Sequence, residues 1–94
     1  MDFKPDLLIN HLQAVIGEVE GKNIAKDGSI AWPICKKLNK IYRLIDELSK
    51  LSQADDLGIA EDPDYLYTLL HDVHLEELKE IKENVKKGYY HGRA

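Results

Sequence analysis

The sequence predicts an all-α protein, a small antiparallel bundle of three or four helices. Three apolar stripes with helical spacing indicate this fold, and they lie within residues 8–19, 34–48 and 66–85. In the middle stripe, apolar residues recur at alternating steps of four and three, which places them on one helix face. Ninety-four residues support one modest core, so we expect a single domain over residues 1–88 and a short C-terminal tail over 89–94. The middle stripe consists of Ile34, Leu38, Ile41, Ile45 and Leu48.

The first helix is expected over residues 5–20. Pro5 suits a first helical turn because the backbone N–H it lacks would have no partner there, and Asp6 complements the positive end of the helix dipole. Gly21 is the expected stop. The buried stripe of this helix should consist of Leu8, Leu12, Val15 and Val19.

The second helix is expected over residues 30–51. It follows a loop that contains Asp27 and Gly28, a strong turn pair. Ser29 is a candidate N-cap, which would place Pro33 inside the first turn. A helix start at Trp32 and Pro33 fits the sequence equally well.

The third helical segment is expected over residues 63–87, after an acidic loop. Asp62 and Pro63 suit the N-cap and the first helical position, and Gly88 should end the segment. The apolar stripe slips near Asp72. Either one helix continues with a shifted seam, or it breaks and Asp72 caps a fourth helix; we expect the continuous helix.

Composition and charge argue against several classes of protein. A hydrophobic content of 44% with 32% charged residues is ordinary for a globular domain and too apolar for disorder. The net charge of −4 argues against a nucleic-acid binder, whose domains usually carry a basic face. No apolar stretch approaches the ~20 residues of a membrane span. Cys35 is the only cysteine, and residues 1–5 lack a signal-peptide pattern, so we expect a cytoplasmic protein.

The strongest candidate binding surface is the outer side of the second helix. Lys36, Lys40 and Arg43 gather there, and Trp32 occupies a compatible helical position. Interfaces often centre on an aromatic or arginine anchor, and charges at their rim govern the rate of encounter. We therefore expect a partner-binding site that contains these four residues. A solvated helix face that complements acidic residues elsewhere is the plainer interpretation of the same cations.

A histidine pair supports the alternative function. His71 and His74 are spaced so that both imidazoles lie on one side of a helix, and Asp64 lies seven residues before His71. A structural metal site needs four ligands and a catalytic one needs three, so we expect no metal and interpret His74 as a half-buried histidine on the apolar seam. The alternative is a small-ligand or metal-binding bundle, with hydrolase activity, centred on this pair.

Other catalytic patterns are incomplete. His71 and Asp72, together with His11, are similar to the metal ligands of HD-type phosphohydrolases, but no aspartate follows them. Glu77 and Glu80 have the E-x-x-E spacing of all-α nucleotide pyrophosphohydrolases, but lysines alternate with them as on a solvated face. The acidic loop over residues 55–64 lacks the ligand order of a calcium-binding EF-hand. We therefore expect no enzyme activity and no cofactor.

Size, acidity and helical layout are similar to those of small bacterial immunity proteins and small phage accessory or inhibitor proteins. This is a likeness of architecture that no particular residue carries. The sequence therefore predicts a small non-enzymatic protein that acts by contact with another protein. Several apolar residues lie outside the main stripes, and they predict a homodimer. These residues are Leu7, Leu44, Leu57, Ile59 and Leu69.

Overall fold

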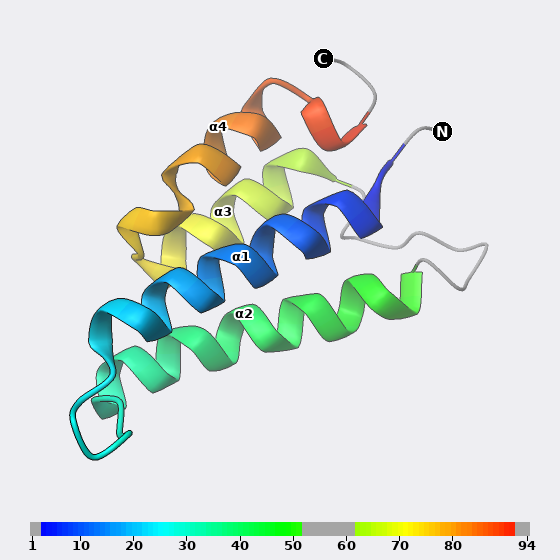
Figure 1. Ribbon diagram of the computed structural model, residues 1–94. Coiled ribbons are helices and arrows are strands. Elements are labelled where there is room, and N and C mark those ends of the chain that lie inside the picture. Colours follow the sequence, from blue (N-terminus) through cyan, green and yellow to red (C-terminus); the bar gives the residue numbers. More distant parts are fainter. Residues whose placement is uncertain (1–2, 52–61, 92–94) are drawn as a thin grey trace.

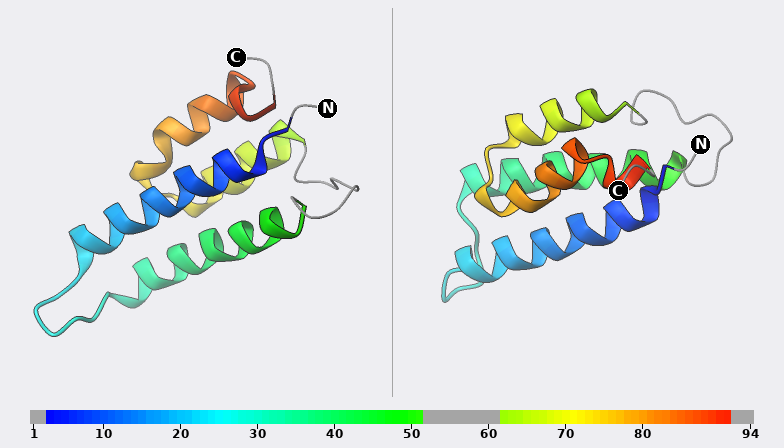
Figure 2. Two further views of the ribbon diagram at one scale, coloured as in Figure 1. Left: turned by 45° about the vertical axis from the view of Figure 1, so that its right-hand side comes forward. Right: turned by 90° about the horizontal axis from the view of Figure 1, so that it is seen from above.

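The computed structural model describes residues 3–51 and 62–91, and these form an all-α four-helix bundle. Consecutive helices run in opposite directions, and each contacts its neighbours in the chain, while α4 returns to contact α1 (Figure 1). Figure 2 shows α1 and α3 on opposite sides of the bundle, with α2 and α4 between them. The predicted antiparallel bundle is confirmed. Its elements are α1 (Pro5–Asn23), α2 (Trp32–Leu51), α3 (Pro63–Val73), the 3₁₀ segment η2 (Glu76–Leu78), α4 (Lys79–Lys86) and the 3₁₀ segment η3 (Tyr89–His91).

One apolar core joins the four helices, and α2 shows how it differs from the prediction. Leu38, Ile41 and Leu48 are buried as expected, but Ile45 is only half-buried. Leu44, for which the sequence suggested no place in the core, is 2% exposed. Because α2 packs against both α1 and α3, its buried face is wider than one stripe and extends toward α3.

The first helix ends later than the sequence predicts, and the second begins at one of the two starts that the sequence allowed. The first helix continues through Gly21 to Asn23. Glycine can adopt helical geometry, and the backbone N–H of Ile24 still donates to the carbonyl oxygen of Glu20. The second helix begins at Trp32, so Ser29 is not its N-cap. Ser29 instead donates from its backbone N and its Oγ to Oδ1 of Asp27, at 3.0 and 2.7 Å. These hydrogen bonds close the turn and lower the pKa of Asp27.

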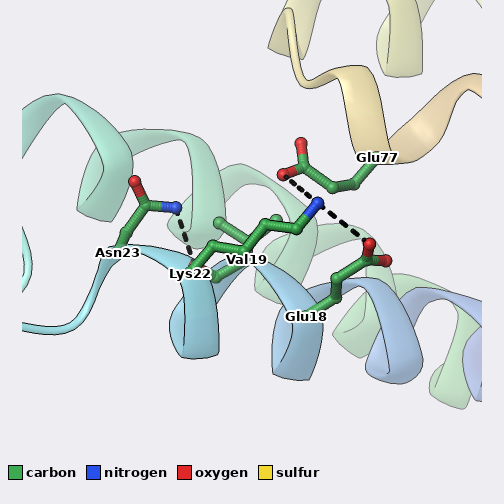
Figure 3. Close-up of polar contacts among 5 residues, drawn as sticks. All are labelled: Glu18, Val19, Lys22, Asn23 and Glu77. Carbon is green, nitrogen blue, oxygen red and sulfur yellow. Dashed lines mark hydrogen bonds and ion pairs between the residues drawn. The ribbon is translucent and has the colours of Figure 1, made fainter.

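The last turn of α1 is held by polar contacts (Figure 3). Asn23 Nδ2 donates to the carbonyl oxygen of Val19, one turn earlier, at 2.8 Å. Lys22 Nζ lies 3.1 Å from Glu18 Oε1 and 3.7 Å from Glu77 Oε2. The hydrogen bond to Glu18 raises the pKa of Lys22. These contacts tie the end of α1 to η2.

The third helical segment breaks, so the predicted continuous helix is wrong. It ends at Val73, and His74 takes the left-handed conformation with φ 59° and ψ 48°. On a continuous helix Leu78 would lie about 140° around the axis from Val73, because five residues turn by about 500°. The break lets Leu75, which is 6% exposed, and Leu78 enter the core. The new turn begins after Leu75 and not at Asp72.

The outer ends of the third segment agree with the sequence. Asp62 is the N-cap of α3 and accepts from the backbone N of Asp64 at 3.0 Å. Gly88, with φ 75°, follows Lys87, the C-cap of α4. Residues 55–61 of the acidic loop lie outside the described residues. No helix in residues 3–51 and 62–91 is long and apolar enough to cross a membrane.

The start of the expected tail reaches the core. Tyr90, in η3, is fully buried, and its carbonyl oxygen accepts from the backbone N of Lys4 at 2.7 Å. Its hydroxyl lies 2.7 Å from Nδ1 of His11 and accepts from Nδ2 of Asn84 at 3.3 Å. These contacts hold η3 beside the start of α1 (Figure 1).

Candidate binding site

The predicted binding residues lie along one side of α2. Trp32, Lys36, Lys40 and Arg43 follow one another at steps of four, four and three, so they point to the same side of the helix. Trp32 is 66% exposed, and the three cations are exposed as well. This side faces away from the apolar core, so its side chains can meet a partner.

The end of α3 supplies the opposite wall of a groove. Because α3 stops at Val73, the residues around this corner lie across from the first half of α2. Together they enclose a hollow of about 560 Å³. All four predicted binding residues line it. The lining consists of Trp32, Pro33, Lys36, Lys37, Asn39, Lys40, Arg43, Asp72, Val73 and His74.

A second hollow, of about 230 Å³, continues along the seam between α2 and α3. It shares Lys40, Arg43, Asp72 and Val73 with the first, so the two form one continuous surface, which we name the basic groove. The second hollow adds apolar side chains to the floor and a carboxylate to the far end. Its further lining residues are Leu44, Glu47 and Leu69.

Contacts already made near the start of α2 shape the first part of the basic groove. Lys36 Nζ lies 5.8 Å from the ring centroid of Trp32, a cation–π contact that holds the two side chains together. Lys37 Nζ donates to the carbonyl oxygen of His74 at 3.2 Å. That hydrogen bond ties α2 to the corner after α3, so the two walls are linked.

The centre of the basic groove carries uncompensated positive charge. Within residues 3–51 and 62–91, Lys40 and Arg43 form no ion pair or hydrogen bond. The groove holds four cations from α2 but only two carboxylates, those of Asp72 and Glu47. The whole chain has a net charge of −4, so this positive region stands out from an acidic molecule and favours an anionic partner.

The residues of the alternative metal site do not form a set of ligands. His71 and His74 are both exposed, with ring centroids 5.9 Å apart, while Asp64 lies two turns of α3, about 10 Å, before His71. No group of three His, Cys, Asp or Glu side chains in the described parts of the chain is placed to hold a metal ion. His71 stacks on Tyr67 at 6.0 Å. His74 is not the half-buried seam residue expected, because the helix ends before it.

Sequence reasoning identified one wall of the basic groove and missed the other. The spacing on α2 was sufficient to group its cations with Trp32. No local pattern revealed that Asp72 and Val73 would face them, because that depends on where α3 ends and how it packs. Leu69 is the one residue of the α3 wall that the sequence pointed to, because it is apolar and lies just outside the apolar stripe of α3. In the structure Leu69 is half-buried.

No protein-family model, curated protein or solved structure matches this chain. The function must therefore be inferred from the geometry and chemistry of the basic groove.

Proposed function

We propose that this chain is a small non-enzymatic binding protein that acts by holding another protein in the basic groove. The observation that carries the proposal is the juxtaposition of exposed Trp32 with Lys40 and Arg43, which have no partner among the described residues, beside the apolar floor at Val73. Tryptophan and arginine are the residues most enriched at the energetic centres of interfaces. Charges near such a centre speed encounter with a partner of opposite sign.

We also propose a biological role and a cellular location for the protein. We infer an inhibitor, immunity or accessory role in the cytoplasm of a bacterium or of a phage-infected cell. Its support is the small, acidic, helical architecture, and the single cysteine suits a reducing compartment. We also infer that the chain forms a homodimer, because symmetric pairing of helix faces is the commonest closed arrangement.

Affinity capture from an extract of the source organism tests the proposed function. The immobilised wild-type protein should retain at least one other protein. The double variant Lys40→Glu, Arg43→Glu should lose it, because two attractive charges become repulsive at the centre of the groove. Both side chains are exposed, so the fold should survive the change.

The matched control is the double variant Lys26→Glu, Lys79→Glu. It changes the net charge by the same amount at exposed lysines outside the basic groove, and it should retain the same protein as the wild type. Circular dichroism of all three proteins should be identical. Equal retention by both double variants, or the absence of any specifically retained protein, would contradict the proposal.

A further inference from the structure

We propose that the segment which occupies the basic groove is an acidic amphipathic helix of the partner protein. This inference rests on the proposed function and specifies the partner's chemistry. The α2 wall runs from Trp32 to Glu47, fifteen residues further on, which corresponds to about 22 Å along the helix. That length matches about four helical turns. A groove between two antiparallel helices is also where an additional helix of a bundle would pack.

An extended segment fits this groove less well than a helix. The walls are the helices α2 and α3, whose backbone N–H and C=O groups, apart from those of their terminal turns, are used within the helices, and the described residues form no sheet edge. An extended peptide would bring backbone groups that find no matching partners there. A helix satisfies its own backbone and presents only side chains, which is the usual way in which a groove between helices is filled.

The cations set the spacing that the partner helix should carry. Lys36, Lys40 and Arg43 lie at steps of four and three, so carboxylates at the same steps on a facing helix can each meet one of them. An apolar stripe beside these carboxylates would lie on Val73 and Leu69. This stripe explains why the groove has an apolar floor as well as positive charge.

A second copy of this chain is the main competing occupant. Glu76, Glu80 and Glu83 are exposed and have the same steps of four and three. However, the apolar neighbours of this row, such as Leu78 and Ile81, are buried in the core of their own molecule. A second copy could therefore offer the charges but not the apolar stripe, and the observations favour a helix from a different protein.

The test uses a synthetic helical peptide of about sixteen residues, a length that spans the groove. It carries glutamates at steps of four and three, leucines on the adjacent stripe, and no tryptophan or tyrosine. The chain contains one tryptophan, Trp32, which lines the groove, so its fluorescence reports binding directly. We expect a saturable blue shift of the emission and a dissociation constant that increases with salt.

Two comparisons make the test specific. A peptide of identical composition, with its glutamates distributed around the helix, should bind at least about tenfold more weakly, because it cannot pair with the row of cations. The protein variant Lys40→Glu, Arg43→Glu should also bind the matched peptide at least about tenfold more weakly. The control variant Lys26→Glu, Lys79→Glu should bind it as the wild type does.

Three results would overturn the inference. Equal binding of the two peptides would show that the groove selects net charge and not one charged helix face, and absence of any peptide binding would exclude such an occupant. The third is an oligomer of the full chain that dissociates in Lys40→Glu, Arg43→Glu and re-forms when this variant is mixed with Glu80→Lys, Glu83→Lys, since the occupant would then be a second copy. None of these results depends on the capture experiment, which tests the proposed function separately.

Discussion

At the scale of single residues, Tyr90 joins the two ends of the chain. The Tyr90 hydroxyl accepts a hydrogen bond from Nδ2 of Asn84, and it also lies 2.7 Å from Nδ1 of His11. A buried hydroxyl with a partner on each side fixes the position of η3 on the bundle.

Replacement of Tyr90 by phenylalanine should change both the stability and its pH dependence. At pH 7 the lost hydrogen bonds should cost about 1 kcal/mol of unfolding free energy. Burial raises the pKa of Tyr90 above its ordinary value of 10.0, so on raising the pH the unfolded chain loses this proton first. The stabilisation is therefore complete below about pH 10 and decreases as the pH rises toward the folded-state pKa.

Urea denaturation at pH 7 and at several values above pH 10 measures this effect. The stability of Tyr90→Phe should fall less steeply with pH than that of the wild type. The control Tyr89→Phe, at an exposed neighbouring ring, should keep the wild-type slope. Identical slopes for all three proteins would contradict the assignment of the alkaline effect to Tyr90.

His74 is a second residue with a testable conformational cost. Its φ of 59° is in the left-handed region, which side chains with a Cβ rarely adopt and glycine adopts freely. His74→Gly should therefore stabilise the fold by about 0.5–1 kcal/mol. Gln13→Gly, at an exposed position inside α1, should instead destabilise it by up to about 1 kcal/mol. Urea denaturation of both variants tests the prediction, which fails if His74→Gly is no more stable than the wild type.

At the scale of elements, α2 contributes one of the main apolar faces of the core. Leu38 and Ile41 are 4% and 0% exposed, so Leu38→Ala or Ile41→Ala should each cost about 2–5 kcal/mol through lost burial and the cavity left behind. Tyr42→Ala, at a half-exposed position of the same helix, should cost much less. Thermal melts followed by circular dichroism measure these differences. Negligible loss in both core variants would contradict the packing of α2.

The helices could be predicted from the sequence wherever a local signal determined them. Apolar periodicity located the regions of the α-helices, and the capping pair Asp62 and Pro63 gave the correct start of α3. The slip of the apolar stripe near Asp72 allowed a break, but its position at His74 could not be predicted, because neither glycine nor proline marks it. The break is favourable because it buries Leu75 and Leu78 in the core. That core exists only when α1 and α3 have packed together.

One wall of the basic groove likewise follows from a local sequence signal, and the other follows from packing. Its α2 wall follows from spacing along one helix, so Trp32 and the cations could be grouped from the sequence alone. Its α3 wall follows from a tertiary contact. Asp72 and Val73 face α2 because the chain turns immediately after them, and Leu44 reaches the floor because α2 packs between two neighbours. Only the assembled bundle defines that surface.

At the scale of the whole molecule, self-association remains a prediction, although the structure changes which apolar residues could form the contact. Leu44 is buried in the core and Leu69 lines the basic groove, so neither is a candidate dimer contact, whereas Leu7 is half-buried and remains one. Leu57 and Ile59 lie outside the described residues. We expect a homodimer that persists in Lys40→Glu, Arg43→Glu, since we propose that the basic groove holds a different protein. Light scattering at about 100 μM, well above the dissociation constant of a typical dimer, should give twice the mass of the chain. A clean monomer mass would refute the prediction.

The charge distribution would orient an anionic partner as it approaches the molecule. A chain with a net charge of −4 has a positive groove between α2 and α3, so an anionic partner is attracted to one region and repelled by much of the rest. This arrangement favours a single docking orientation. The central claim is therefore that the basic groove, and not another face of the bundle, contacts the partner.

Site-specific photo-crosslinking in the source organism tests that claim most directly. A photoreactive amino acid at Asn39, an exposed residue that lines the basic groove, is compared with the same amino acid at Gln13, an exposed residue of α1. The groove position should give a covalent adduct of defined mass, and the adduct should disappear when Lys40→Glu and Arg43→Glu are added. An adduct from Gln13 alone, or one from Asn39 that survives the charge reversal, would contradict the claim.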